Sequence, residues 1–269
     1  PLPETLVADH RLEEAMRDAE LVVVVVPSHA ARETAQKIKP LLPKDALICS
    51  ASKGIENDSL MLMSQVLVDV LGEDVEPRLT YISGPSFAKE VGLGMPTAVV
   101  GAGKDAKNTE RVQRAFATDK LRVYSSDDVV GVEMGGALKN VIAIAAGTID
   151  GRGLGHNSRA GMITRGLFEI GMLASRLGGH PLTLAGLSGM GDLVLTCTGD
   201  LSRNRTVGVA LGQGRKLPEI LAGLGHVAEG VKTAKSAYDL SVREAVEMPI
   251  TQEVYKVLYE QKDPRQSVV

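Results

Sequence analysis

Lys139 is a candidate acid or base because it lies in a stretch with almost no other charge. The segment 129–150 (VVGVEMGGALKNVIAIAAGTID) is apolar on nearly all faces of a helix, and only Glu133 and Lys139 carry charge in its middle. Such a helix is buried at the centre of a fold. Burial lowers the pKa of a lysine and prepares it for proton transfer. The helix alone leaves an alternative equally open, in which Lys139 pairs with a core carboxylate or reaches an edge.

Two glycines, Gly135 and Gly136, precede this lysine. A glycine inside a helix costs roughly 1 kcal/mol relative to alanine. The usual gain is the close approach of another backbone or of a ligand. We therefore expect the two glycines to make room for a substrate or for the turn at Gly84–Ser86.

The segment Ser202-Arg203-Asn204-Arg205 is a candidate phosphate site, because it opens a predicted helix. A helix N-terminus offers free N–H groups and a partial positive charge. Guanidinium groups bind phosphate through two hydrogen bonds. The alternative is a surface cap with solvated charges.

Several other loops place polar groups where a ligand could meet them. Each has a plainer interpretation as well, namely a solvated loop lysine, an ordinary turn, a helix N-cap or the start of a helix. The candidates are Lys53 in SASKG, Gly84 and Ser86 in GPSFA, Asp192 after SGMG, and Glu229 in HVAEG. Asp192 could accept from a substrate hydroxyl or pair with Lys139. The SGMGD loop has no preceding strand and is not a dinucleotide fingerprint.

The elements that carry these loops change character near residue 128. Strands are predicted at 21–26, 46–51, 79–83, 97–101 and 121–125, with helices between them, and Ser28 is expected to cap one of those helices. This alternation indicates a partial doubly wound, Rossmann-like parallel sheet, whose ligands bind beyond the carboxyl ends of the strands. The rest reads as helices at 129–148, 159–177, 181–187, 205–211, 217–223, 231–241 and 252–259. We predict a dinucleotide-binding domain at 1–128 and an all-helical substrate and catalytic domain at 129–269.

Composition narrows the class of protein. The chain has 269 residues, a formal charge of -3 and two distant cysteines, Cys49 and Cys197. The charge argues against nucleic acid as a partner, and the cysteines suggest reduced thiols in a cytoplasmic protein. We find no uninterrupted apolar run of the roughly 18 residues that a membrane span needs, and we expect no membrane insertion. No cluster has the spacing of metal ligands.

Six motifs in order resemble the bacterial NAD(P)-dependent glycerol-3-phosphate dehydrogenase family: SKGIE, GPSFAKEV, ALKNVIAIAAG, SGMGDLVLTCTG, SRNR and VAEGVKT. The resemblance runs across nearly the whole chain. It implies an oxidoreductase that interconverts sn-glycerol 3-phosphate and dihydroxyacetone phosphate by hydride transfer with NAD or NADP, supplying glycerophospholipid synthesis. A small phosphorylated substrate is the implied partner, and a homodimer is left open.

The resemblance also implies roles for individual residues. Lys139 would be the proton acceptor. The implied substrate contacts are Lys53, Gly84, Ser86, Lys139, Asp192, Ser202, Arg203 and Asn204. The implied cofactor contacts are Lys53, Ala88, Arg203, Val227 and Glu229.

One departure from the family pattern concerns the start of the chain. The family opens with a βαβ unit that bears a Gly-rich dinucleotide loop, and this sequence does not contain it. We therefore expect an N-terminally truncated chain. Two alternatives follow, which are another β-hydroxyacid-type dehydrogenase, such as one acting on 3-hydroxyisobutyrate, and a non-catalytic binding module.

Overall fold

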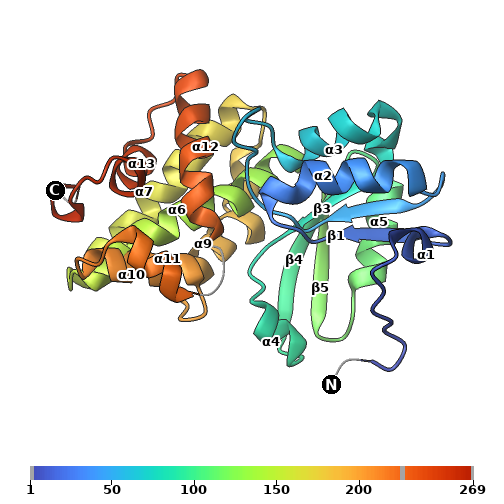
Figure 1. The fold of residues 1–269 in the computed structure, drawn as a ribbon, viewed down its shortest axis with the longest axis horizontal. Coiled ribbons are helices and arrows are strands. Elements are labelled where there is room, and N and C mark those ends of the chain that lie inside the picture. Colours follow the sequence, from blue (N-terminus) through green and yellow to red (C-terminus); the bar gives the residue numbers. More distant parts are fainter. Residues whose placement is uncertain (1–2, 225–227, 268–269) are drawn as a thin grey trace.

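The computed structural model describes residues 3–224 and 228–267. A strand-and-helix part and an all-helical part lie side by side, and the long helix α6 (Val129–Gly151) begins where the first part ends (Figure 1). The predicted fold class, a Rossmann-like sheet followed by a helical domain, is confirmed.

The sheet has five strands in the order β1 (Leu21–Val24), β2 (Leu47–Ser50), β3 (Leu79–Ser83), β4 (Thr97–Ala102), β5 (Leu121–Ser126). β1, β2 and β3 are parallel, β3 and β4 are antiparallel, and β4 and β5 are parallel again. The carboxyl ends of the first three strands therefore meet at one edge. Ligands of such sheets bind at that edge.

The inner strands β2 and β3 are buried on both faces, to which their successive side chains point in alternation. Ile48 and Leu79 pack with residues of α2 (Ser28–Ile38) and α3 (Met63–Leu71). Leu47 and Cys49 pack instead with Val112 of α5 (Ala106–Phe116). Burial on both sides thus explains the apolar sequences of β2 and β3, whereas Val23 of β1 remains 43 % exposed.

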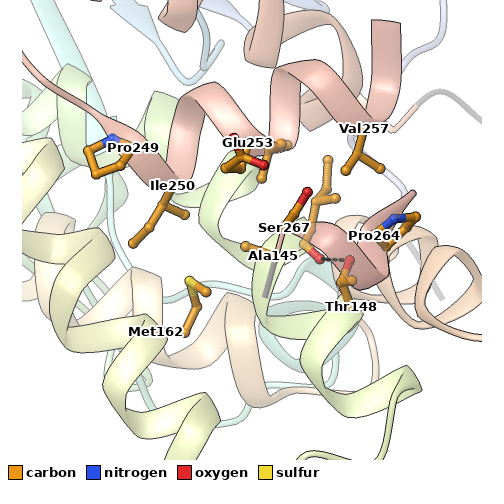
Figure 2. A pocket seen from close by; sticks show the side chains of 11 residues that line it. Ala145, Thr148, Met162, Pro249, Ile250, Glu253, Val257, Pro264 and Ser267 are labelled. Atoms are coloured by element: carbon orange, nitrogen blue, oxygen red, sulfur yellow. Dashed lines mark hydrogen bonds between the residues drawn. The ribbon is translucent and has the colours of Figure 1, made fainter. Parts of the chain in front are cut away.

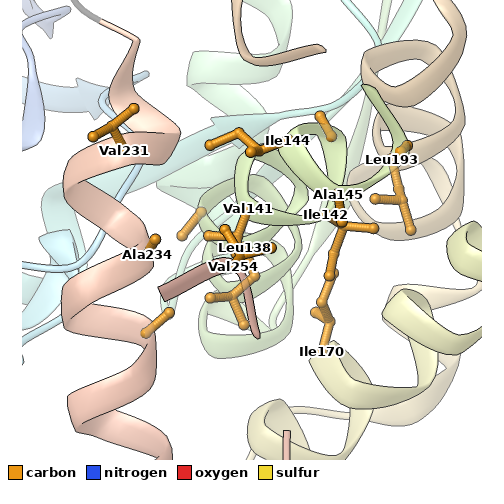
Figure 3. Close-up of a cluster of buried hydrophobic side chains, with 14 of the residues drawn as sticks. Leu138, Val141, Ile142, Ile144, Ala145, Ile170, Leu193, Val231, Ala234 and Val254 are labelled. Carbon is orange, nitrogen blue, oxygen red and sulfur yellow. The ribbon is translucent and has the colours of Figure 1, made fainter. Parts of the chain in front are cut away.

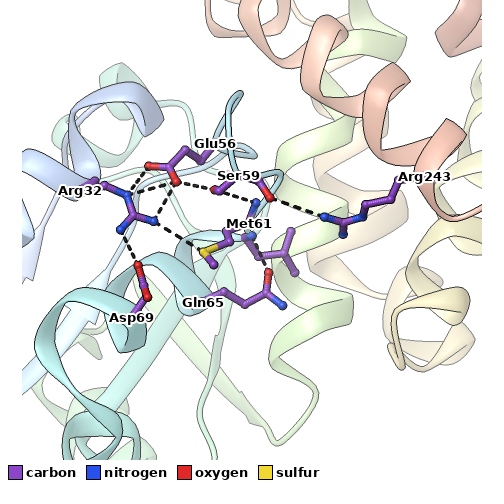
Figure 4. A network of polar contacts seen from close by, with 8 residues as sticks. Arg32, Glu56, Ser59, Met61, Gln65, Asp69 and Arg243 are labelled. Atoms are coloured by element: carbon purple, nitrogen blue, oxygen red, sulfur yellow. Dashed lines mark hydrogen bonds and ion pairs between the residues drawn. The ribbon is translucent and has the colours of Figure 1, made fainter.

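An arginine joins the two helices on the first face. Arg32 of α2 binds Glu56 at 2.9 Å and Asp69 of α3 at 2.5 Å (Figure 4). Ser59, beside Glu56, offers its carbonyl oxygen to Arg243 of the helical part. This network ties the loop before α3 to both parts of the molecule.

The remaining elements are short or belong to the helical part. The short ones are α1 (Leu12–Met16), η1 (Lys39–Leu41), η2 (Glu73–Arg78), α4 (Ala88–Gly92), α8 (Pro181–Leu184), the π-helical turn η3 (Leu187–Gly191) and η4 (Pro264–Gln266). The longer ones are α7 (Gly155–Arg176), α9 (Asp192–Thr198), α10 (Arg203–Gly212), α11 (Leu217–Leu224), α12 (Glu229–Arg243) and α13 (Pro249–Tyr259).

α6 is the axis of the helical core. Its side chains pack against Ile170 of α7, Leu193 of α9, Ala234 of α12 and Val254 of α13 (Figure 3). Among the described helices, α6 alone is long and apolar enough to cross a bilayer, and 89 % of its most apolar window is buried inside the protein. The search for uninterrupted apolar runs missed it because Glu133 and Lys139 interrupt the sequence.

Glycines let α10 lie directly on α6. A Cβ on Gly147 would come 2.2 Å from the carbonyl oxygen of Arg205, and one on Gly208 would come 2.1 Å from that of Ile144. The two backbones are therefore in contact, which compensates the helical cost of these glycines.

Some local predictions were wrong. Ser28 is the first residue of α2 rather than its N-cap, which is Pro27, and its side chain makes no capping bond. Not all of the segment between β2 and β3 that was expected to be helical is so, because Ile55 and Leu62 pair in an isolated bridge and α3 begins only at Met63. The helix α9 was not predicted, since the glycine-rich sequence before it reads as a loop.

Candidate active site

Two lysines converge on one buried carboxylate. Lys139 Nζ donates to Asp192 Oδ1 at 2.5 Å, and Lys53 Nζ donates to Asp192 Oδ2 at 3.0 Å. Asp192 is 1 % exposed, Lys139 is 9 % exposed, and the Lys53 side chain is 20 % exposed. The site therefore joins the loop after β2, the middle of α6 and the first residue of α9. We call these three residues the lysine cluster.

Gly135 positions the carboxylate. A Cβ there would come 2.3 Å from the carbonyl oxygen of Ser188, so the π-helical turn η3 lies directly on α6. Asp192 follows this turn as the first residue of α9 and binds the lysines instead of capping the helix. The expectation that Gly135 admits a substrate or the Gly84–Ser86 turn was wrong, because a different backbone segment occupies that space.

Gly136 makes room on the other side of Lys139. A Cβ there would lie 2.6 Å from Ser83 Oγ and 3.5 Å from Lys53 Cδ. Ser83 is the last residue of β3, directly before the Gly84–Ser86 turn. The carboxyl end of the sheet thus packs against α6, and the missing side chain lets the Lys53 stem pass.

The electrostatics of the cluster make Lys139 easier to deprotonate than an ordinary lysine. Burial, reinforced by the charge of Lys53, lowers the pKa of Lys139 to about 8, while Asp192 works in the opposite direction. A lysine with a pKa close to neutrality can both take and return a proton. The lowered pKa of Lys139 is consistent with the acid or base role that its position in an apolar helix suggested.

An amide network lies one residue further along α6. Asn204 Nδ2 donates to Asn140 Oδ1 at 2.9 Å, and the Gly230 N–H donates to Asn204 Oδ1 at 3.0 Å. Both asparagine side chains are buried. Asn140 was not among the candidates taken from the sequence, although its position directly after Lys139 was a usable signal.

The residues of the SRNR segment make different kinds of contact. The Ser202 hydroxyl accepts from the Arg205 N–H at the start of α10, which makes Ser202 the N-cap. Arg205 binds Asp150 at 2.8 Å and Asp200 at 3.1 Å. Arg203 is the first residue of α10, and its side chain is exposed. Of the two arginines predicted for the phosphate site, Arg205 is thus held by carboxylates of the protein.

The turn after β3 docks on the helical part. Gly84 has a φ of 142°, and a Cβ there would lie 2.9 Å from Val99 Cα, so only glycine fits. The Ser86 hydroxyl donates to the Gly84 carbonyl oxygen at 3.0 Å and the residue is exposed. Ala88 is exposed at the start of α4. Beside them, Phe87 packs closely on Gly199 at the end of α9.

A pocket of about 180 Å³ lies at the carboxyl ends of β1 and β2. Lys53 and Glu229 both line it, with Pro27 and Ser52 among the others. An ammonium and a carboxylate suit the amide and ribose hydroxyls of a nicotinamide nucleotide, and the location is the usual one for such ligands. The residues present therefore fit the cofactor. Val227, another expected contact, lies outside the described residues.

Larger cavities lie elsewhere. A pocket of about 340 Å³ between α6, α7 and α13 has mostly apolar walls that include Ile144, Met162 and Ile250 (Figure 2). No residue of the lysine cluster lines it. Within residues 3–224 and 228–267, no group of three His, Cys, Asp or Glu side chains could hold a metal ion.

Comparison with known proteins agrees with this geometry. Residues 1–109 match the N-terminal model, and residues 128–269 the C-terminal model, of NAD-dependent glycerol-3-phosphate dehydrogenase. The glycerol-3-phosphate dehydrogenase [NAD(P)+] of Myxococcus xanthus is 55 % identical over 269 residues, which cover 100 % of this chain and 80 % of that protein. The protein of the same name from Geobacter sulfurreducens is 57 % identical over 258 residues, 96 % of this chain and 77 % of that protein.

A solved structure extends the likeness to three dimensions. The crystal structure of glycerol-3-phosphate dehydrogenase from Coxiella burnetii superposes with a TM-score of 0.95 at 40 % identity, covering 100 % of this chain and 81 % of that one. A ketopantoate reductase from Ralstonia eutropha shares the fold alone, with 15 % identity and a TM-score of 0.58. The chain therefore belongs to the NAD-dependent glycerol-3-phosphate dehydrogenase family.

Proposed function

We propose that this enzyme interconverts sn-glycerol 3-phosphate and dihydroxyacetone phosphate with NAD or NADP, and so supplies glycerophospholipid synthesis. The family membership supports the activity, and the observation that carries the mechanism is the lysine cluster. Its buried Lys139, with a pKa of about 8, shares Asp192 with Lys53, which lines the pocket that fits a nicotinamide nucleotide.

Lys139 is the proposed proton acceptor. Neutral Lys139 takes the hydroxyl proton of glycerol 3-phosphate as the hydride leaves the carbon, and its ammonium form returns the proton in the reverse direction. The bound nicotinamide supplies the hydride chemistry. Asp192 fixes the direction of the Lys139 ammonium through the bond of 2.5 Å.

The proposed substrate contacts surround this proton acceptor. Lys53 and Asp192 would bind the oxygens near the reacting carbon, while the turn at Gly84 and Ser86 would cover the site. Ser202, Arg203 and Asn204 would bind the phosphate at the N-terminus of α10, where free N–H groups favour anions. A phosphate held there fixes the carbinol near Lys139, which reduces the cost of orientation.

The proposed cofactor contacts are Lys53 and Glu229 in the pocket of about 180 Å³, together with Ala88, Arg203 and Val227. We further propose a domain boundary between residues 128 and 129. Its support is that the side chain of Asp128 caps α6, whose later residues belong to the helical core. A cytoplasmic location and a homodimeric state complete the proposal.

The two alternatives have less support. A different β-hydroxyacid dehydrogenase would share the fold, but the relatives at 50 % identity and above carry the glycerol-3-phosphate name. A non-catalytic module would not need a buried lysine and carboxylate beside a nucleotide pocket. Neither alternative accounts for the lysine cluster together with the SRNR segment.

Substitution of Lys139 by alanine tests the proposal. We expect Lys139→Ala to lower kcat for NAD(P)H oxidation with dihydroxyacetone phosphate by about 10²- to 10⁴-fold, the usual contribution of a general acid or base. Lys107→Ala, at an exposed lysine of α5, is the matched control and should keep full activity.

Two results would overturn the proposal. Turnover of Lys139→Ala at the wild-type rate would remove Lys139 as the proton acceptor. Equal use of unphosphorylated dihydroxyacetone by the wild-type enzyme would remove the phosphate from the proposed substrate class.

A further inference from the structure

A small polar cavity lies behind the lysine cluster, between the sheet and α6. Its volume is about 10 Å³, and its walls come from β2, β3, the loop after β2, and α6. This volume is at the lower end of the roughly 10–15 Å³ that one water needs. The residues that line what we call the polar cavity include Ser50, Lys53, Tyr81, Ser83, Glu133 and Gly136.

Four oxygen atoms of this cavity are shielded from solvent and have no hydrogen-bond partner among the residues that the structure describes. They are Ser50 Oγ, Tyr81 OH, Ser83 Oγ and Glu133 Oε2. The three hydroxyl residues are at most 5 % exposed. A buried polar atom without a hydrogen bond costs roughly 1–3 kcal/mol, and a concentration of such atoms around one small space is typical of a site for ordered water.

Glu133 and Lys53 both line this cavity. Glu133 Oε1 accepts from the Ser64 N–H at 2.9 Å, which leaves Oε2 for the cavity. Lys53 passes over Gly136, one turn further along α6, and its Nζ binds Asp192. A water in the cavity would therefore lie between the carboxylate of Glu133 and the side chain of Lys53, a member of the lysine cluster.

We propose that the polar cavity holds ordered water that links Glu133 to Lys53, and that Glu133 is a positioning residue that sets the charge balance of the lysine cluster. The functional part of this inference rests on the proposed role of Lys139. The hydration part stands by itself, because it follows from the four unpartnered oxygens.

The charges around the cavity determine the direction of the effect. Burial raises the pKa of Glu133 to about 7, so its carboxylate is anionic at the pH where Lys139 loses its proton. Tyr81, whose pKa is raised by burial, stays neutral there. Glu76 and Cys49 face Tyr81 from η2 and β2. In the proposed arrangement, the water would let the anionic Glu133 offset the Lys53 charge, which lowers the pKa of Lys139.

Two measurements test the proposal. A crystal structure of the wild-type enzyme should show a water within hydrogen-bond distance of Ser83 Oγ and Glu133 Oε2. Glu133→Gln should shift the pH profile of kcat for glycerol 3-phosphate oxidation by about 0.5 pH unit towards lower pH. That shift is of the size that one charge produces across roughly 10 Å of partly screened protein.

Glu76→Gln is the matched control, since this exposed carboxylate faces Tyr81 from outside the polar cavity. It should leave the profile in place. A dry cavity would overturn the hydration part, and a Glu133→Gln profile that coincides with the wild-type profile would overturn the positioning role. If the wild-type enzyme oxidises glycerol 3-phosphate, a dry cavity or an unshifted profile counts against this proposal alone and not against the proposed function.

Discussion

Asp192, which lies against α6, and Asp150, which belongs to α6, each bind two basic side chains. The two resulting clusters differ in their chemistry. The lysine cluster lies at the middle of the helix and the other, which we call the arginine cluster, at its C-terminal end. The first is Asp192 with Lys139 and Lys53, and the second is Asp150 with Arg159 and Arg205. Asp192 is 1 % exposed, whereas the Asp150 side chain is 16 % exposed.

The two clusters differ in the type of basic side chain, which is lysine in one and arginine in the other. A guanidinium does not lose its proton in proteins, so the arginine cluster can only hold α7 and α10 against α6. A buried lysine shifts its pKa readily, and Lys139 shows such a shift. With arginine this arrangement of charges is a structural clamp, whereas with lysine it is the site at which we propose proton transfer.

Asp192→Asn should lower kcat more than any substitution in the arginine cluster. The amide leaves two ammonium groups facing each other without a countercharge and loosens the direction of Lys139. We expect kcat with dihydroxyacetone phosphate at pH 7 to fall by about 10²- to 10⁴-fold. Steady-state kinetics measure it, and urea unfolding of the same variant shows whether the fold persists. A folded variant that retains wild-type kcat would contradict the assignment of the cluster.

Asp150→Asn should affect stability rather than catalysis. It removes the partner of Arg159 at 3.1 Å and of Arg205 at 2.8 Å. Because the pairs are only partly buried, we expect the free energy of unfolding to drop by about 1–3 kcal/mol, between the values for surface and buried pairs. Urea denaturation measures this, and kcat should change by less than about threefold. A loss of kcat as large as that of Asp192→Asn would remove the distinction between the clusters.

Much of this fold could be predicted from the sequence because the signals are local. β-branched runs between helical segments predicted the five strands, and the apolar stretch around Lys139 predicted the central helix. The antiparallel direction of β4 against β3 was not predicted, because strand composition does not fix direction. Neither was α9, whose identity as a helix depends on packing against α6.

The site was predicted as a set of residues rather than as a geometry. Lys53 and Asp192 are 139 positions apart in the sequence and meet only in the fold. The two arginines of SRNR look equivalent in the sequence, but Asp150, 55 positions before Arg205, engages one of them. Long-range partners such as these are decided by helix packing, which the α6 and α10 glycines allow.

The pH dependence of the rate is the prediction that examines the lysine directly. In the proposed mechanism oxidation requires neutral Lys139, whose pKa burial lowers to about 8. The kcat should therefore rise about tenfold per pH unit below pH 8 and level off above it. Reduction requires the protonated form, so its kcat should be level below pH 8 and fall above it. Rate measurements in both directions between pH 6 and 10, on the order of two units either side of that pKa, check both limbs. Since arginine stays protonated over this range, Lys139→Arg should remove the limbs along with the activity. A wild-type profile without opposite limbs near pH 8 would place the proton on another group and would leave the lysine cluster, like the arginine cluster, a structural clamp.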